Sequence, residues 1–231
     1  MKNVIEIKNI SKKYGKVEAL REVSLTLEHG IYALLGPNGS GKTTLMNILA
    51  GLLKSSGGEV LYNGEDIEKS GIAYRSRVGY MPQYPAMYPN FAVKEFLLYL
   101  AELKKLPPER EGEIDYLLSR VELSDVAERK ISALSGGMKQ RLSLCTAVLG
   151  DPEILILDEP TAGLDPKQRV VLREFISEIA ENKTVIWATH IVSDVERIAD
   201  EVIFMKKGVA SLAERGGSLE AQYLSFFGDI I

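Results

Sequence analysis

The chain has 231 residues, of which 45% are hydrophobic and 26% are charged, so it suits one large domain and is too short for two domains of ordinary size. Its net charge of −4 argues against a nucleic-acid-binding surface, and no window approaches the roughly eighteen apolar residues of a membrane span. The first ten residues carry charge and are unlike a signal peptide. The single cysteine, Cys145, excludes an internal disulfide and is typical of a buried residue in a cytosolic protein.

The amino-terminal part is predicted to be rich in strands. Alternating apolar residues predict strands over residues 4–7 and 23–27, with a polar loop at residues 11–15 between them. Tyr14 in that loop has two interpretations, stacking on a purine base or capping the edge of a sheet. A further strand is expected over the apolar residues 31–35.

Residues 36–43, GPNGSGKT, lie between that strand and a helix that ends at Gly51. The glycines let successive backbone N–H groups converge on a phosphate at a helix N-terminus, where the helix dipole favours negative charge. We expect Lys42 to reach the outer phosphates of a nucleotide and Thr43 to hold Mg²⁺. The residues predicted to bind the nucleotide here are Gly36, Pro37, Asn38, Gly39, Ser40, Gly41, Lys42, Thr43 and Thr44.

The middle of the chain changes from strands to helices. Strands are expected over residues 59–62 and 77–81, and the first is followed by the hairpin turn Asn63-Gly64. Apolar residues at helical spacing then predict helices over residues 93–105 and 109–121. These two helices indicate a helical insertion between strands.

Helices and buried strands alternate in the carboxyl-terminal half. Ser135 is placed to cap a helix that ends near residue 149, and Asp165 is placed to cap another that begins with a proline. Residues 193–196 have the pattern of a capping box, and beyond residue 208 we read no chemistry. Continuous apolar runs predict strands of a parallel sheet at residues 154–157, 184–188 and 201–205.

Two adjacent carboxylates, Asp158 and Glu159, follow the first of these buried strands. Asp158 can hold Mg²⁺ through water, and Glu159, on the other side of the strand end, can polarise an attacking water. Either carboxylate alone could be a solvated strand end. The pair, in a chain that also has a phosphate-binding loop, favours catalysis.

The stretch LSGGMKQR, residues 134–141, followed by the strand that ends in Asp158-Glu159, resembles the signature of the ATP-binding cassette (ABC) ATPases. The resemblance covers nearly the whole chain, and the motifs occur in the family's order. They are the adenine-stacking aromatic Tyr14, the Walker A loop at residues 36–43, the Q-loop glutamine Gln83, the signature residues Ser135, Gly136 and Gly137, the Walker B strand at residues 154–159, the D-loop aspartate Asp165 and the switch histidine His190.

This resemblance implies an α/β fold with a P-loop NTPase core. The expected architecture is a mixed sheet, an N-terminal antiparallel β subdomain and an inserted α-helical subdomain at about residues 84–150. All of these would belong to a single ABC nucleotide-binding domain spanning residues 1–231.

The family also implies a shared catalytic site. ATP is sandwiched between the Walker A loop of one nucleotide-binding domain and the signature of another, so a second domain, either a second copy or a related chain, is an expected partner. Ser135, Gly136 and Gly137 would contact the partner's ATP at a helix N-terminus. The implied cofactors are ATP and Mg²⁺. The implied catalytic residues are the general base Glu159, the γ-phosphate contact His190 and the sensor Gln83, and the implied metal site has Thr43, Gln83 and Asp158.

The expected function is that of the ATP-binding and ATP-hydrolysing subunit of an ABC transporter. It would be cytoplasmic and peripheral on the inner face of the cell membrane, held there by a separate transmembrane permease subunit. The compact chain and residues 134–166 resemble bacterial type-2 exporters, so export is preferred over import. The aromatic cluster Tyr84, Met87, Tyr88 and Phe91 could grip the permease or pack the insertion's own core.

Two other functions are weighed against transport. A non-transport ABC ATPase acting on DNA or ribosomes would carry a long coiled-coil insertion or two cassettes, and the chain has neither feature, so no nucleic-acid partner is expected. A binding module without catalysis is disfavoured because Lys42, Glu159 and His190 are all present.

Overall fold

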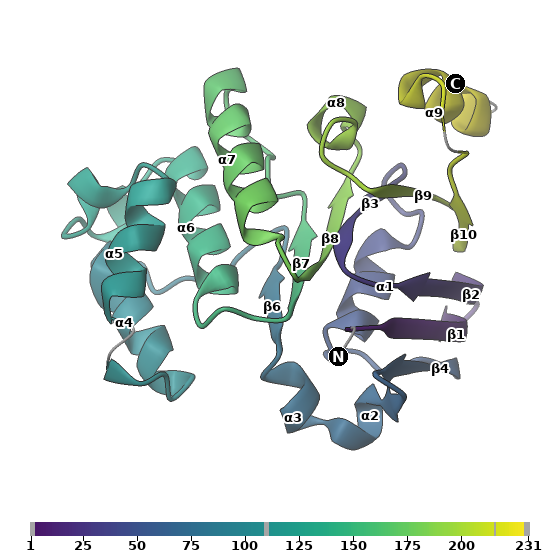
Figure 1. The fold of residues 1–231 in the computed structure, drawn as a ribbon, viewed down its shortest axis with the longest axis horizontal. Coiled ribbons are helices and arrows are strands. Elements are labelled where there is room, and N and C mark those ends of the chain that lie inside the picture. Colours follow the sequence, from purple (N-terminus) through teal and green to yellow (C-terminus); the bar gives the residue numbers. More distant parts are fainter. Residues whose placement is uncertain (1–2, 109–110, 215, 229–231) are drawn as a thin grey trace.

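Six strands form a mostly parallel sheet through the middle of the computed structural model, which describes residues 3–108, 111–214 and 216–228 (Figure 1). The strand order is β10-β9-β3-β8-β7-β6, and only β10 runs antiparallel to its neighbour. These strands are β3 (Gly30–Leu35), β6 (Val78–Met81), β7 (Ile154–Asp158), β8 (Thr184–Thr189), β9 (Glu201–Lys206) and β10 (Val209–Leu212).

A second, antiparallel sheet of four strands lies beside the first, in the order β2-β1-β4-β5. Its strands are β1 (Ile5–Tyr14), β2 (Val17–Leu27), β4 (Gly57–Tyr62) and β5 (Glu65–Asp66). Asn63 and Gly64 both have positive φ, which confirms the predicted hairpin turn. The predicted polar loop at residues 11–15 is wrong, because β1 continues to Tyr14. Bulges and the positive φ of Asn9 break the alternation of β1, which hides the strand from a period-two pattern.

The helices divide between the two faces of the central sheet. Helix α1 lies on the side of the antiparallel sheet, whereas α4, α5, α6 and α7 gather on the other side (Figure 1). The longer helices are α1 (Lys42–Leu49), α4 (Val93–Leu103), α5 (Glu111–Arg120), α6 (Gly136–Val148), α7 (Pro166–Ile179) and α9 (Leu219–Phe227), and the four-residue helices are α2 (Ile67–Ser70), α3 (Ile72–Arg75) and α8 (Val192–Val195). The helical insertion is thus confirmed, although residues 109–110 of its predicted second helix lie outside the described residues.

Alternate residues of the central strands face two separate cores. On β3, Ala33 and Leu35 face the helical side, whereas Tyr32 and Leu34 face α1 and the antiparallel sheet. Trp187 on β8 is fully buried in the first core, as expected. Because both faces of these strands are covered, their sequence is continuously apolar instead of alternating.

Helix α4 begins without the usual capping side chain. Ala92 occupies the N-cap position, where Ser, Thr, Asp or Asn is preferred. The N–H groups of Val93 and Lys94 instead donate to the carbonyl oxygens of Arg129 (3.1 Å) and Ala127 (2.9 Å). The backbone of a neighbouring loop therefore replaces part of the missing cap.

The carboxyl-terminal part contains two findings that the sequence did not predict. The capping box at residues 193–196 is wrong, because α8 starts at Val192 and Ser193 lies inside the helix. Beyond residue 208, strand β10 and helix α9 extend the fold, and Phe226 of α9 stacks on Phe204 of β9. Among the described residues, none of the helices combines the length and apolarity that crossing a membrane requires.

Candidate nucleotide-binding and catalytic site

The site predicted from the sequence lies at one edge of the central sheet. Residues 36–43 follow β3, Glu159 follows β7 and His190 follows β8, and these three strands are parallel neighbours in the order β3-β8-β7. The carboxyl ends of parallel strands meet at the same edge, where open α/β sheets bind their ligands. The fold therefore gathers groups that are up to about 150 residues apart in the chain.

The phosphate-binding loop packs closely against the backbone of β2 and β9. A Cβ atom on Gly36 would lie 2.4 Å from the carbonyl oxygen of Met205, and one on Gly41, where φ is 110°, would lie 2.6 Å from that of Ala19. The carbonyl oxygen of Ser40 accepts a 2.9 Å hydrogen bond from the N–H of Gly208. Glycine is thus required by close approach as well as by φ, and the β9–β10 turn supports the loop.

Lys42 is folded back onto its own loop. Its ammonium donates to the carbonyl oxygens of Gly36 (2.6 Å) and Pro37 (3.2 Å). Burial lowers the pKa of Lys42 below its usual range, and the charges of Glu159 and Asp158 partly offset this. The cation is therefore held where its desolvation is only partly compensated, which favours contact with an anion.

Thr43 and Asp158, two of the three residues predicted to hold Mg²⁺, contact each other, and the third, Gln83, lines the same cavity. The hydroxyl of Thr43 donates to Oδ2 of Asp158 at 2.9 Å. Hydroxyl and carboxylate oxygens suit Mg²⁺, which is usually held by one or two protein ligands together with phosphates and water. In the described part of the chain, no group of three or more His, Cys, Asp and Glu residues could hold a metal ion alone. The donor set therefore fits an ion that shares its ligands with a nucleotide.

Burial raises the pKa of Asp158 above its usual value, and the nearby Glu159 adds to the rise, whereas Thr43 and Lys42 act against it. At pH values between the pKa of Asp158 in the unfolded chain and its higher pKa in the folded chain, the folded chain binds more protons than the unfolded chain. The free energy of unfolding therefore falls as the pH rises through this window. We expect Asp158→Asn to stabilise the nucleotide-free protein at neutral pH, with a gain that shrinks below about pH 4. Hydrolysis with Mg²⁺ should fall about 10- to 100-fold.

Urea unfolding at several pH values and a phosphate-release assay measure the two effects. The exposed Asp125→Asn is the matched control and should change neither. An Asp158→Asn protein that is less stable at neutral pH, or one that hydrolyses ATP normally, would contradict this assignment.

Glu159 sits in a conformation that few non-glycine residues adopt. Its φ is 51°, which costs of order 1 kcal/mol, and the residue is almost completely buried. Its N–H donates to the carbonyl of Ala188 at 2.9 Å, and its own carbonyl accepts from the N–H of Ala162 at 3.0 Å. These bonds hold the Glu159 backbone in this conformation.

The carboxylate of Glu159 contacts two residues at the end of β8. His190 places Nδ1 at 2.8 Å from Oε1, and Thr189 donates its hydroxyl to Oε2 at 3.2 Å. The His190 side chain is 55% exposed, whereas that of Glu159 is only 5% exposed. The imidazole therefore lies between the buried carboxylate and solvent, where it can orient both the carboxylate and a reacting molecule.

One cavity of about 240 Å³ brings together nine of the predicted residues. It is lined by Ala19, Asn38, Gly39, Gly41, Lys42, Thr43, Thr44, Gln83, Asp158 and Glu159. Ala19 was missed, because nothing in an alternating strand marks it. Ala19 is two residues from Val17, which pairs with Tyr14 across the β1–β2 hairpin. The tip of this hairpin, with the half-exposed Tyr14, therefore lies near the cavity.

The signature and the D-loop aspartate do not line this cavity, and neither do Tyr14 and His190. Ser135 caps α6 by accepting from the N–H of Met138 at 3.2 Å, and Asp165 caps α7 by accepting from that of Gln168 at 2.9 Å. Ser135, Gly136 and Asp165 are exposed. The signature and the D-loop aspartate are thus presented to solvent and not to the chain's own phosphate-binding loop.

Two functional candidates were missed by the sequence reasoning. Thr189 contacts the Glu159 carboxylate, and Gln140 donates from Nε2 to the Glu159 carbonyl oxygen at 2.8 Å. Both are buried polar residues. The sequence signals that could have indicated them are that Thr189 precedes the predicted His190 and that Gln140 lies within the predicted signature stretch, residues 134–141.

The aromatic cluster after Gln83 is partly packed and partly exposed. The ring of Phe91 packs on Phe96 and Tyr99 of α4, with centroids 6.5 and 5.5 Å away. Tyr84 is 84% exposed, and Tyr88 contacts the same rings while remaining 52% exposed. Part of the cluster therefore packs the insertion, and Tyr84 with one side of Tyr88 faces solvent.

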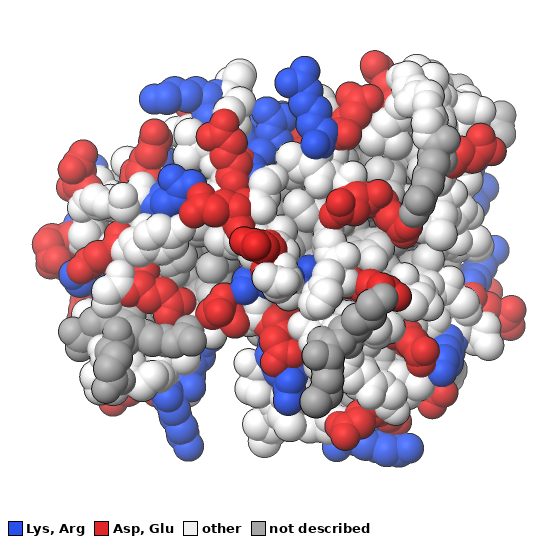
Figure 2. All heavy atoms as spheres, in the orientation of Figure 1, with Lys and Arg blue, Asp and Glu red and all other residues white. Residues whose placement is uncertain are grey.

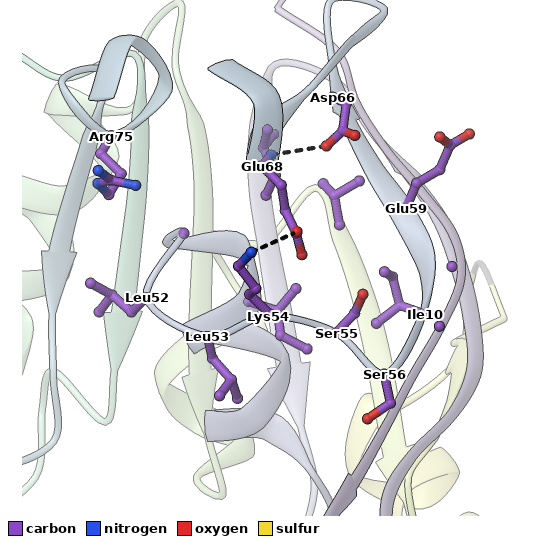
Figure 3. A pocket seen from close by; sticks show the side chains of 16 residues that line it. Ile10, Leu52, Leu53, Lys54, Ser55, Ser56, Glu59, Asp66, Glu68 and Arg75 are labelled. Atoms are coloured by element: carbon purple, nitrogen blue, oxygen red, sulfur yellow. Dashed lines mark hydrogen bonds and ion pairs between the residues drawn. The ribbon is translucent and has the colours of Figure 1, made fainter. Parts of the chain in front are cut away.

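A second hollow of about 480 Å³ lies at the other end of α1, between this helix, β4 and α2 (Figure 3). Three of its charged side chains are already engaged: Lys54 pairs with Glu68 at 3.8 Å, and Asp66 caps α2 by accepting from the backbone N–H of Glu68. We therefore place the chemistry at the phosphate-binding loop. On the face shown in Figure 2, basic and acidic side chains alternate without a continuous basic area among the described residues.

Comparisons with known proteins identify the family. The ABC transporter family model matches residues 20–162. The chain is 36% identical to the Nod factor export ATP-binding protein I of Burkholderia lata, over 88% of this chain and 68% of that protein. It is also 36% identical to the sulfate/thiosulfate import ATP-binding protein CysA of Pectobacterium atrosepticum, over 89% of this chain and 64% of that protein. The chain belongs to the ATP-binding proteins of ABC transporters, a family of ATPases.

A solved structure confirms the predicted fold. The dimeric structure of MJ0796, a bacterial ABC transporter cassette, superimposes with a TM-score of 0.84 at 28% identity, over 93% of this chain and all of that one. The P-loop NTPase core and the antiparallel N-terminal sheet are thus those of an ABC cassette.

Proposed function

We propose that residues 1–231 act as one nucleotide-binding domain that hydrolyses ATP in a sandwich with a second such domain, a second copy or a related chain. The observation that carries this proposal is the separation of two sets of residues. Lys42, Thr43 and Asp158 line one cavity, whereas Ser135 at the N-terminus of α6 is exposed outside it. A helix N-terminus with free N–H groups suits a phosphate, so the exposed signature fits the ATP of another molecule. The dimeric state of MJ0796 supports this arrangement.

Within this sandwich each residue has a defined task. The loop N–H groups and Lys42 bind the phosphates, and Tyr14 stacks on the adenine. Thr43, Gln83 and Asp158 would hold Mg²⁺, which would neutralise charge on the phosphate oxygens.

Hydrolysis needs a base close to the attacking water. Glu159 takes a proton from that water, and His190, whose Nδ1 is already bonded to Glu159, orients it toward the γ-phosphate. Asp165 contacts the nucleotide site across the dimer.

Transport follows from the opening and closing of this dimer. We propose that a transmembrane permease subunit docks on the exposed part of the aromatic cluster, at Tyr84 and Tyr88, and holds the domain peripherally on the inner face of the membrane. Exposed aromatic side chains are suited to such contacts. ATP binding would close the dimer and hydrolysis would reopen it, and each change would be passed to the permease.

Export is the direction that we propose. It rests on the resemblance of residues 134–166 to type-2 exporters, since relatives named for export and for import are equally similar, at 36% identity each. Inverted membrane vesicles containing the chain and its permease should accumulate substrate when ATP is added outside. Accumulation only in right-side-out vesicles with internal ATP would indicate import.

Ser135→Ala tests the shared site. The variant loses an N-cap worth about 1 kcal/mol, and it also loses a hydroxyl that we assign to the partner's ATP. We expect kcat for ATP hydrolysis to fall about tenfold or more, because a hydrogen bond to a charged group is lost. Size-exclusion chromatography should show weaker ATP-dependent dimerisation.

Ser218→Ala is the matched control, because Ser218 caps α9 in the same way by accepting from the N–H of Ala221. It should lose similar stability and keep hydrolysis and dimerisation. Equal loss of activity in both variants would reduce Ser135 to a cap and argue against the shared site.

A further inference from the structure

Gln140 connects the signature helix to the predicted general base. It lies in the second turn of α6, five residues after the cap Ser135, and it is buried. Its Nε2 donates to the backbone carbonyl oxygen of Glu159 at 2.8 Å. The bond joins residues 19 positions apart on two different elements.

The acceptor of this bond is a residue whose backbone conformation needs support from its surroundings. Glu159 has a positive φ of 51°, a conformation that persists only where the surroundings fix it. Gln140 is the side chain that holds its carbonyl, beside the backbone N–H of Ala162 at 3.0 Å. A carbonyl oxygen has two lone pairs, and these two donors satisfy both.

The start of α6 is also packed against the segment that follows Glu159. A Cβ atom on Gly137 would lie 3.0 Å from the side chain of Gln168 and 3.2 Å from that of Leu164. The helix N-terminus and residues 159–168 are therefore in contact at two points, and a displacement of one is resisted by the other.

We propose that Gln140 is a positioning residue that sets the orientation of the Glu159 carboxylate and couples it to the signature helix of the same chain. The inference rests on the proposed function, in which the N-terminus of α6 contacts the partner's ATP while Glu159 acts on the chain's own ATP. Engagement of one ATP by Ser135 would then be transmitted through Gln140 to the base that hydrolyses the other.

Gln140→Met tests this inference, because methionine keeps the length and approximate volume of glutamine but has no N–H donor. We expect kcat for ATP hydrolysis to fall about tenfold with KM and the dissociation constant for ATP unchanged, since one hydrogen bond to the base is lost and no nucleotide contact is touched. Steady-state kinetics and calorimetry with the full chain measure these values.

Ser143→Ala is the matched control on the same helix. Ser143 is fully buried, and its hydroxyl has no hydrogen-bond partner among the described residues, so its removal should leave kcat unchanged. A Gln140→Met protein with normal kcat would overturn the proposal. So would a fall in kcat accompanied by equal losses of ATP affinity and thermal stability, because that pattern indicates a purely structural role.

Failure of the proposed function would look different. In that case the unmodified chain itself would neither hydrolyse ATP nor dimerise with it. If the unmodified chain does both and Gln140→Met matches it, the positioning role alone is wrong.

Discussion

Lys42→Ala is expected to abolish measurable ATP binding. The ammonium is the buried cation of the phosphate-binding loop, and at present it satisfies only the carbonyl oxygens of Gly36 and Pro37. Phosphate oxygens would replace these neutral acceptors with charged ones. Each hydrogen bond to a charged group is worth about 1.5–3 kcal/mol, so the loss of this side chain should weaken binding at least about 100-fold.

Calorimetric titration with ATP and Mg²⁺ measures this change. Lys54→Ala is the matched control, because Lys54 lies beyond the other end of α1 and its side chain is 86% exposed. The affinity of the Lys54→Ala protein for ATP should equal that of the unmodified protein. Unchanged affinity in Lys42→Ala would contradict the assignment of the phosphate-binding loop.

Glu159→Gln is expected to stop hydrolysis and to preserve ATP binding. The amide has nearly the shape of the carboxylate and can still accept from His190, but it cannot take a proton from water. Loss of a general base lowers the rate about 10²- to 10⁴-fold. Because a negative charge next to the phosphates is removed, the affinity for ATP should be equal or higher.

A phosphate-release assay and a binding titration separate the two effects. Glu153→Gln is the control, since Glu153 precedes β7 at the end opposite to Glu159 and pairs with Arg77. Its hydrolysis should be normal. Substantial residual hydrolysis by Glu159→Gln would show that another group acts as the base.

The local motifs were the predictable part of this protein. The strand before Gly36 and the turn at Asn63-Gly64 follow from residue types with few alternative conformations, and the structure has both. The meeting of Thr43 with Asp158 was also expected, because the ends of parallel strands share one edge.

What the sequence could not predict depends on contacts between distant segments. Residues 11–14 look like a loop because bulges shift their register, yet Ser11 pairs with β4 and residues 12–14 pair with β2. Ser193 lies in a capping pattern, but the path of the chain after β8 starts the helix earlier. The bond from Gln140 to Glu159 likewise requires the packing of α6 on the central sheet, which no local pattern encodes.

We propose that this chain carries one half of each of two ATP sites, and that dimerisation completes both sites. The most direct test is size-exclusion chromatography with light scattering on Glu159→Gln, with and without ATP and Mg²⁺. We predict a monomer without nucleotide and a stable dimer, with ATP retained, when it is present. A protein that binds ATP under these conditions and remains monomeric would contradict the shared ATP site.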